Sequence, residues 1–197
     1  METNIDNKDD VRETILNVAK NIFGKYGFKK TTMDEIAEAA RKAKSSIYHY
    51  FKSKEEIFKA IVEKESLTLN AAITKAIHAE TTPKNKIRAY VLTRMETISE
   101  LSNLYSALKD DYWEHYNFIE KVRVRYDTEE VNTIKSILSN GVENGDFMIE
   151  DIELTAFAIV TALKGLEYPL YIEKNNNQIE KRFDGLLNVL FYGIMKK

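Results

Sequence analysis

Hydrophobic residues along this chain mostly recur at intervals of three and four, and sustained alternation of hydrophobic with polar residues is rare. A spacing of three and four places side chains on one face of an α-helix, whereas alternation would indicate strands. Two prolines and seven glycines in 197 residues leave few points at which a helix must end. The pattern therefore predicts an all-α protein with about nine helices, one for each separate stretch of helical spacing.

The ends of these helices are marked by capping residues, prolines and glycines. Asp10 and Glu13 can cap the first helix, Gly27 ends it, and Thr82 followed by Pro83 starts another. The predicted helices span about residues 10–26, 33–40, 44–51, 53–79, 83–101, 104–122, 128–144, 151–166 and 178–195. The inner face of the first helix is expected to carry Val11, Ile15, Val18, Ala19, Ile22, Phe23 and Tyr26.

The stretch from Thr31 to Phe51 predicts two short helices joined by a tight break. Thr32 and Glu35 have the spacing of a capping box, in which the hydroxyl and the carboxylate each bond a backbone N–H group. A second pair with this spacing, Ser53 and Glu56, opens the next helix. The residues expected to pack inward are Met33, Ile36, Ala37 and Ala40 in the first short helix and Ile47, Tyr50 and Phe51 in the second.

The outward face of the second short helix is polar and basic. A short helix that is packed on one side and offers hydrogen-bond donors on the other fits the major groove of DNA. A helical hairpin whose charged face meets solvent is the alternative, but the two caps, the break and the outward Ser, Tyr and His residues favour DNA binding. The residues expected to contact DNA are Thr32, Arg41, Lys42, Lys44, Ser45, Ser46, Tyr48, His49 and Lys54.

The charge distribution agrees with a DNA-binding module near one end of the chain. The net charge is −2, but residues 20–59 hold 10 Lys and Arg against 5 Asp and Glu, and the remainder holds 19 against 26. Counterion release depends on the local contact surface, so a basic module on an acidic body can bind DNA.

A set of residues around the two short helices has the order and spacing of a known family. It comprises Phe23, Gly27, Thr31-Thr32, Ile36-Ala37, Ala39-Ala40, Tyr48-His49-Tyr50-Phe51 and Ser53-Lys54-Glu55. These residues resemble the N-terminal domain of the tetracycline-repressor (TetR) family of bacterial transcription regulators. The chain departs from that family at Arg41-Lys42-Ala43, where a Gly-Val-Ser turn is usual. The resemblance implies a three-helix helix-turn-helix domain at residues 1–52, with a linking helix that continues to about 65, and a regulatory domain at 53–197.

The resemblance also implies that the last two helices pair with their copies across a two-fold axis. Their hydrophobicity supports this independently, because two such helices present more apolar surface than one small domain easily covers. A homodimer would hold two recognition helices about one DNA turn apart and would require a near-palindromic operator. The alternative is that both helices complete a monomeric core. The expected interface residues are Ala156, Ala162, Gly165, Phe183, Leu187, Leu190, Phe191 and Ile194.

The middle of the chain is rich in aromatic residues, which suggests a domain that encloses a small, mainly apolar ligand. By resemblance, the family's regulatory domain holds such a small-molecule pocket, and occupation of the pocket releases DNA. For any single aromatic residue, an ordinary place in the core is an equally good interpretation. The residues expected at the pocket are Tyr90, Arg94, Tyr112, Trp113, Tyr116, Phe157 and Lys164.

Other functions find less support in the sequence. Asp111, Glu114 and His115 lie within about one helical turn and could share a metal, but a site needs further ligands and the chain has only three histidines. The chain has no cysteine and no glycine-rich phosphate loop. We therefore expect no enzyme, no cofactor and no metal site, although a Ser–His pairing stays open. A transcriptional activator of the same fold and a helical adaptor also stay open.

The remaining expectations concern location and partners. No apolar run approaches the length of a membrane span, and the polar, acidic N-terminus is unlike a secretion signal. We expect a soluble, cytoplasmic protein whose partners are double-stranded DNA, a second copy of the chain and a small-molecule effector. The operator sequence, the effector and the regulated genes cannot be read from the residues.

Overall fold

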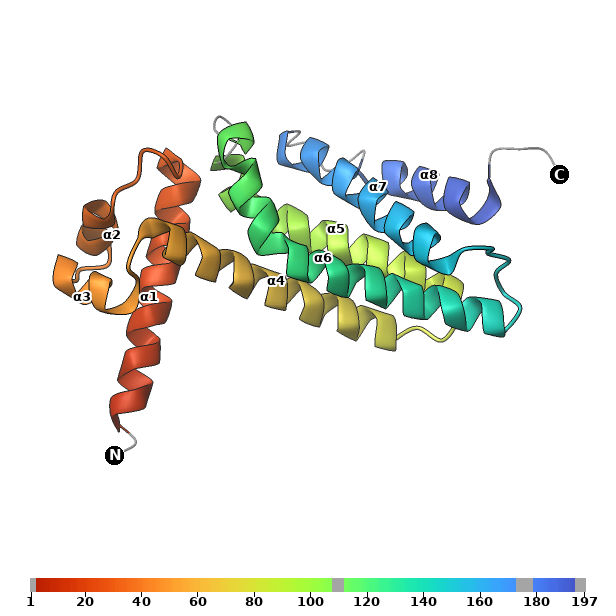
Figure 1. Ribbon diagram of the computed structural model, residues 1–197, viewed down its shortest axis with the longest axis horizontal. Helices are drawn as coiled ribbons and strands as arrows, with labels where there is room; N and C mark the ends of the chain where they lie inside the picture. Colours follow the sequence, from red (N-terminus) through yellow and green to blue (C-terminus); the bar gives the residue numbers. More distant parts are fainter. Residues whose placement is uncertain (1–2, 108–111, 173–178, 194–197) are drawn as a thin grey trace. The chain divides into compact units, whose positions relative to one another are not determined.

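The computed structural model of the chain confirms the all-α class, since every element in its described residues is a helix (Figure 1). The backbone is described for residues 3–107, 112–172 and 179–193, and the side chains for residues 9–98, 126–166 and 181–193. The helices are α1 (Thr3–Tyr26), α2 (Met33–Ala39), α3 (Lys44–Tyr50), α4 (Lys54–His78), α5 (Pro83–Ala107), α6 (Tyr112–Glu143), α7 (Ile152–Ile172) and α8 (Ile179–Tyr192).

Several helix boundaries differ from the sequence prediction, and α5 continues to Ala107 where an end near residue 101 was expected. The first helix begins at Thr3 and not near Asp10. The break expected between residues 122 and 128 is absent, because α6 runs continuously through it. Residues 3–23 and 112–140 contain no proline or glycine, so nothing in either stretch stops a helix. The described chain consequently has eight helices and not about nine.

The chain divides into two compact units, which we describe separately. The N-terminal unit consists of Met1–Leu67 with Asn103–Arg123, and the C-terminal unit of Thr68–Ser102 with Val124–Lys197. The division falls within α4, the helix that the sequence predicts to link two domains.

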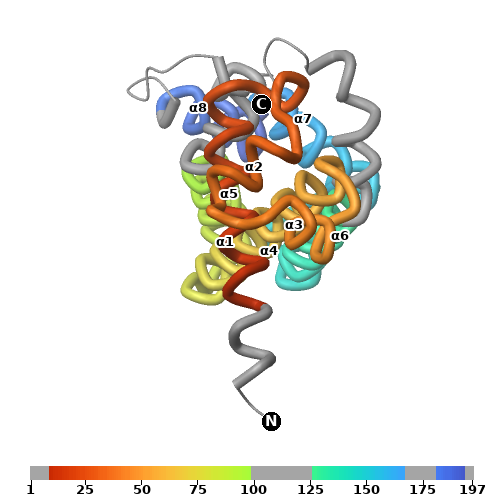
Figure 2. Tube along the Cα trace, turned by 90° about the vertical axis from the view of Figure 1, so that its left-hand side faces the viewer, coloured from red at the N-terminus to blue at the C-terminus, as the bar shows by residue number. Residues whose placement is uncertain are grey.

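In the N-terminal unit, α2 packs against α1 and α3 packs against α2 (Figures 1 and 2). Three aromatic rings meet in its core, with centroid separations of 5.2 Å for Phe23–Phe28 and 5.2 Å for Phe28–Phe58. Tyr26, which was expected on the inner face of α1, is 56% exposed. That expectation was wrong because α1 ends at this residue, and Phe28 from the following loop supplies the ring that packs on Phe23.

The C-terminal unit is built around a core of aliphatic side chains from α4 to α8, together with Tyr90 and Phe183. Its fully or almost fully buried members include Ile87, Tyr90, Val91, Ile134, Ala156, Val160 and Leu163. No helix in the described part of the chain is both long enough and apolar enough to cross a membrane.

The corner between α6 and α7 depends on a close approach at Gly141. A Cβ atom at this position would lie 2.1 Å from Cδ2 of Phe147. The Gly141 carbonyl accepts hydrogen bonds from the N–H groups of Asp146 at 2.8 Å and Phe147 at 3.0 Å. The Phe147 ring therefore lies directly on the helix backbone, in a space that a larger residue at 141 would occupy.

Candidate nucleic-acid interface

The start of α2 is fixed by the capping box that the sequence predicts. The Glu35 N–H group donates to Thr32 Oγ1 at 3.2 Å, and the Thr32 N–H group donates to Glu35 Oε2 at 2.7 Å. Two N–H groups that the helix itself leaves without a partner are thereby satisfied. Thr32 is exposed, but its hydroxyl already serves this cap.

The turn between α2 and α3 places a bulky residue in a backbone conformation that favours glycine. Arg41 has a φ of 52°, in the left-handed region, and no other non-glycine residue of the described chain has a positive φ. The turn is closed by the N–H of Lys42, which donates to the Ala37 carbonyl at 3.0 Å. The Ala43 side chain makes no capping hydrogen bond, and α3 begins at Lys44. Arg41 therefore carries the steric cost of a left-handed residue.

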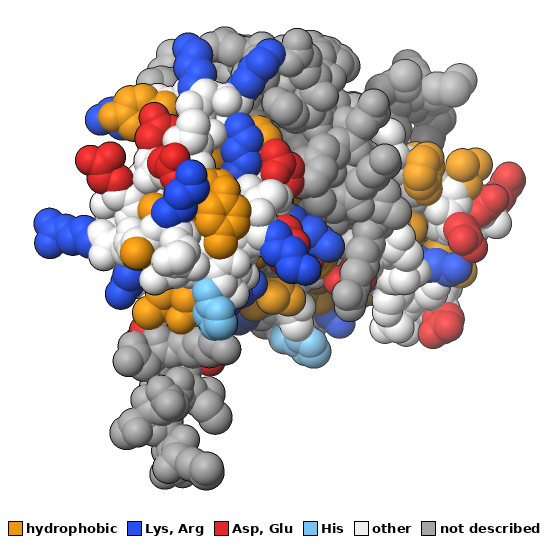
Figure 3. Space-filling model, turned by 60° about the vertical axis from the view of Figure 1, so that its left-hand side comes forward, with side chains coloured by type: hydrophobic (Ala, Val, Ile, Leu, Met, Phe, Trp, Pro, Cys, Tyr) orange, Lys and Arg blue, Asp and Glu red, His pale blue; other side chains and the backbone are white. Residues whose placement is uncertain are grey.

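The two faces of α3 separate hydrophobic from polar side chains. Ile47 is 0% exposed and Phe51, its C-terminal cap residue, is 4% exposed. On the opposite face Lys44, Ser45, Tyr48 and His49 are exposed, as are Arg41, Lys42 and Ala43 in the preceding turn. Ser46 and Tyr50 are half-buried. Lys and Arg side chains are spread over the surface of the N-terminal unit, with carboxylates between them (Figure 3).

Lys44, at the start of α3, is held by a carboxylate that the sequence analysis did not single out. Its Nζ lies 2.8 Å from Oδ1 and 3.0 Å from Oδ2 of Asp34, which lies in the first turn of α2. The hydrogen bond to Asp34 and the negative charge of that carboxylate raise the pKa of Lys44. Lys44 is thus fully charged at neutral pH, and it must exchange Asp34 for any phosphate or base that it binds.

Lys54, expected to contact DNA, is directed toward the protein. Its Nζ donates to the backbone carbonyl groups of Phe28 at 3.0 Å, Lys29 at 3.2 Å and Thr31 at 3.1 Å. A lysine ammonium group has three donors, so these three bonds occupy all of them. A phosphate could be bound only in place of one of these carbonyl groups, and we therefore leave Lys54 out of the proposed contact set.

The cap at the start of α4 differs in one detail from the predicted box. The Glu56 N–H group donates to Ser53 Oγ at 3.3 Å, as expected. The Glu56 carboxylate, however, accepts from the N–H group of Lys52 at 2.7 Å and not from that of Ser53. The carboxylate thus holds the backbone at Lys52, which lies one residue further from the helix than Ser53.

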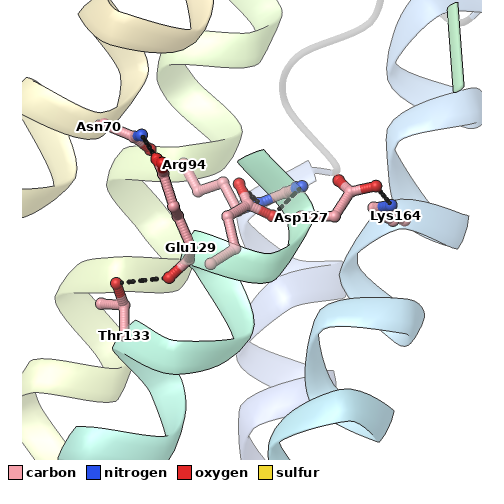
Figure 4. A network of polar contacts seen from close by, with 7 residues as sticks. Asn70, Arg94, Asp127, Glu129, Thr133 and Lys164 are labelled. Atoms are coloured by element: carbon pink, nitrogen blue, oxygen red, sulfur yellow. Dashed lines mark hydrogen bonds and ion pairs between the residues drawn. The ribbon is translucent and has the colours of Figure 1, made fainter. Parts of the chain in front are cut away.

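Of the residues expected at a ligand pocket, two form the interior of the C-terminal unit. Tyr90 and Arg94 are both 0% exposed. Arg94 Nε and Nη2 donate to Oε1 and Oε2 of Glu130, each at 3.0 Å, in a paired arrangement between α5 and α6 (Figure 4). Glu130 was not identified from the sequence, because nothing in the local pattern distinguishes it from Glu129.

Two of the other pocket candidates, Phe157 and Lys164, belong to α7. Phe157 is 58% exposed on α7. Lys164 forms an ion pair with Asp127 of α6 (Figure 4). The side chains of Tyr112, Trp113 and Tyr116 lie outside the described residues.

A cavity of about 220 Å³ adjoins Tyr90 in the C-terminal unit. Its lining is mainly polar and comes from α4, α5 and α6, as Figure 4 shows for three of its residues, Asn70, Glu129 and Thr133. Asn70 Nδ2 donates to Glu129 Oε2 at 3.2 Å across it. The lining residues are Asn70, Ile73, Thr74, Tyr90, Glu129, Glu130 and Thr133.

The residues expected at a dimer interface divide between the core and the surface. Ala156, Phe183 and Leu187 are 0%, 3% and 4% exposed, so they pack inside the unit. These three residues were expected at a dimer interface, and that expectation is corrected, because the hydrophobic faces of α7 and α8 pack into the core of the unit. Ala162, Gly165 and Leu190 are exposed, and Phe191 is half-buried. Ile194 lies outside the described residues.

No cluster of His, Asp and Glu that could hold a metal ion occurs among the residues that were described. Asp111, Glu114 and His115, the metal candidates of the sequence, lie outside the described side chains.

Known proteins share both parts of this arrangement. Residues 15–61 match the family described as bacterial regulatory proteins, tetR family, and residues 74–196 match the family described as QacR-like protein, C-terminal region. The chain is 25% identical over 191 residues to the HTH-type transcriptional regulator QacR of Staphylococcus aureus, covering 95% of this chain and 100% of that protein. It is 27% identical over 155 residues to the HTH-type transcriptional regulator YhgD of Bacillus subtilis, covering 77% and 79%.

Solved structures agree in fold. The fatty acid degradation regulator FadR from Bacillus halodurans superposes with a TM-score of 0.77 at 19% identity, covering 94% of this chain and 97% of that chain. The TetR family regulator PfmR from Thermus thermophilus superposes with a TM-score of 0.70 at 23% identity, covering 92% and 99%.

Proposed function

The chain belongs to the TetR family of bacterial regulatory proteins and is a transcriptional regulator with a DNA-binding helix-turn-helix; from this premise we propose that it is a repressor that binds a near-palindromic operator as a homodimer and leaves it when a small effector binds. The observation that carries the proposal is the division of α3 into a buried face at Ile47 and an exposed polar face at Lys44, Tyr48 and His49. A helix braced from one side can enter the major groove without losing its own packing.

We assign the DNA contacts from the chemistry of each exposed side chain. Lys44 donates to a phosphate or to a guanine edge, and Ser45 is small enough to let the helix approach the bases. Tyr48 and His49 donate to phosphate oxygens, which fixes the register of the helix on the duplex. Arg41 and Lys42 add two charges in the turn before α3, and Ser46 and the N-terminus of α2 at Thr32 complete the proposed surface.

An apolar groove on the C-terminal unit supports the homodimer. It has a volume of about 310 Å³ and is lined by side chains of α7 and α8 with Val91 of α5. Its exposed members Leu154 and Leu190 have 63% and 36% of their surface accessible, and nearby Phe157 and Val189 have 58% and 50%. Apolar side chains that crowd one face in this way are typical of protein–protein interfaces.

Leu190→Glu tests the homodimer, because it places a charge in the proposed interface. We expect the variant to elute as a monomer in size-exclusion chromatography with light scattering. Leu67→Glu is the matched control, since Leu67 is 64% exposed in the N-terminal unit. A Leu190→Glu variant with the same mass in solution as the wild type would contradict the proposed interface.

For the effector, we propose that its polar part binds in the cavity beside Tyr90 and Glu129. The cavity is small and mainly polar, so it favours a compact group with hydrogen-bond donors, and any apolar part of the effector must extend beyond it. Thr133→Leu would fill this space. We expect that variant to bind the operator normally but to lose release by a metabolite pool that releases the wild type; normal release would contradict this site.

Selection of genomic fragments by the purified protein tests the function as a whole. We expect recovered fragments to share a sequence with approximate two-fold symmetry, and gel-shift titration at physiological salt to show preference for it over random DNA. A reporter gene with this sequence near its promoter then separates repression from activation. Equal binding of all fragments would contradict a sequence-specific regulator.

A further inference from the structure

We propose that Lys54 is a positioning residue for operator recognition: its ammonium group holds the loop before α2 through three carbonyl groups, and it acts on DNA only through that loop. The inference rests on the proposed operator-binding face of α2 and α3. It departs from the contact expected for Lys54 from the sequence.

Three carbonyl groups and one aromatic ring surround the ammonium group of Lys54, whose side chain is half-buried. The carbonyl oxygens of Phe28, Lys29 and Thr31 lie 3.0, 3.2 and 3.1 Å from its Nζ. The Nζ also lies 4.7 Å from the centroid of the Phe28 ring, within the range of a cation–π contact. Phe28 is 4% exposed, and its ring is part of the aromatic core of the unit.

The loop that Lys54 holds leads directly into the start of α2. Thr31 is 1% exposed and its hydroxyl donates to the Gly27 carbonyl at 2.8 Å. The next residue, Thr32, is the N-cap of α2. The ammonium group therefore joins the first residue of α4 to the backbone that sets where α2 begins, and α3 packs against α2.

The ammonium group supplies hydrogen-bond donors to the carbonyl groups of this loop. Carbonyl groups of an irregular segment have no ladder of N–H donors opposite them, and each needs a partner. One lysine satisfies three such groups from a single point, which restrains the loop at Phe28, Lys29 and Thr31 together. Without the ammonium group the loop can shift, and α2 and α3 would present Lys44 and Tyr48 to DNA in a wider range of positions.

A positioning role and a direct phosphate contact make different predictions for salt dependence. A lysine that neutralises a phosphate contributes about 0.9 to the slope of log K against log salt concentration. A lysine that acts through the loop contributes affinity for the operator but nothing to this slope. Lys54→Met separates the two, because it removes the ammonium group and keeps an unbranched side chain.

The experiment is a salt titration of operator binding by the wild type, Lys54→Met and Lys44→Met in the full-length protein. We expect Lys54→Met to bind the operator about tenfold more weakly with the slope of the wild type, and Lys44→Met to lower the slope by about 1. A slope lowered by about 1 in Lys54→Met, or an unchanged affinity, would overturn the proposal. Absence of site-selective binding by the wild type would instead reject the proposed function.

Two further measurements keep the test independent of folding. Lys54→Arg keeps the charge, but a planar guanidinium cannot reach three carbonyl groups arranged around one point, so we expect its operator affinity to stay below that of the wild type. Recovery to wild-type affinity would overturn the geometric role. In the wild-type complex, NMR should find the Lys54 ammonium protons still bonded to the protein, and a scalar coupling between Nζ and a DNA phosphorus would refute the proposal.

Discussion

Two ion pairs, one in each unit of this protein, differ in their exposure to solvent and in what they can do. In the N-terminal unit the side chains of Lys44 and Asp34 are 56% and 64% exposed. In the C-terminal unit those of Arg94 and Glu130 are 0% and 6% exposed. An exposed pair is weak and can exchange one partner for a phosphate, whereas opening a buried pair leaves a lone charge inside the protein. The first arrangement suits a surface that binds a polyanion, and the second fixes α5 to α6.

The largest effect is expected where the buried pair is broken. Arg94→Met leaves the Glu130 carboxylate without its bidentate partner and should lower the free energy of unfolding by about 3–5 kcal/mol in urea titration. The double variant Arg94→Met/Glu130→Leu removes both charges and should recover most of the loss. A single variant within about 1 kcal/mol of the wild type would show that the buried and exposed pairs do not differ as proposed.

The next largest effect is expected on operator binding and not on the stability of the fold. Tyr48→Ala removes an exposed donor from α3 and should weaken operator binding by about tenfold to a hundredfold, while unfolding and dimerisation stay unchanged. Tyr26→Ala is the matched control, because Tyr26 is also an exposed tyrosine of the N-terminal unit but lies at the end of α1. Equal operator affinities for the two variants in gel-shift titration would argue against the assigned recognition face.

A smaller effect is expected in the turn between α2 and α3. Arg41→Gly relieves a left-handed residue and should raise the free energy of unfolding by about 1 kcal/mol. Lys42→Gly, at a position without a positive φ, should lower it. Operator affinity should nevertheless fall in Arg41→Gly, since a proposed phosphate contact is lost. Loss of stability in Arg41→Gly would show that the arginine side chain contributes more than its backbone costs.

The smallest effect on stability is expected for the exposed pair itself. Asp34→Asn should leave the free energy of unfolding almost unchanged, because the pair is exposed to solvent. It should lower the pKa of Lys44 toward its ordinary value, because the hydrogen bond and charge that raise it are weakened. A raised lysine pKa means that the stabilisation is present at neutral pH and is lost only as the pH rises through the pKa of Lys44. NMR titration measures this pKa directly.

Asp34→Asn should also change the affinity of the protein for DNA. Removing a carboxylate beside Lys44 frees the ammonium group and removes a repulsion of phosphates, so affinity for random-sequence DNA should rise a few-fold. Glu38→Gln, an exposed change on the same helix, is the control. An unchanged affinity for random DNA would mean that Asp34 does not compete with phosphate for Lys44.

Local features of the fold could be predicted from the sequence. The capping box of Thr32 and Glu35 and the start of α5 at Pro83 depend on neighbouring residues only, and both are present. The buried face of α3 at Ile47 and Phe51 likewise follows from helical spacing. In each case, the residues that determine the structure lie within one or two helical turns.

Features that depend on distant residues could not be predicted. Arg94 and Glu130 are separated by 36 positions, and Lys54 and Phe28 by 26. A hydrophobic stripe shows that a helix has an apolar face but not what covers it, which is why Phe183 and Leu187 were assigned to a dimer interface and not to the core. The continuous α6 was not predicted for a related reason, since hydrophobic spacing alone does not show whether two neighbouring helical stretches form one helix.

The contact between Gly141 and the Phe147 ring has a consequence for how this corner can change during evolution. Because the ring occupies the volume of any Cβ atom at position 141, neither residue can be replaced freely while the other is kept. Among relatives that retain the corner, alanine or a larger residue at 141 should be found together with a smaller side chain at 147. The two positions should therefore covary, and chimaeras that exchange only one of them should fold poorly.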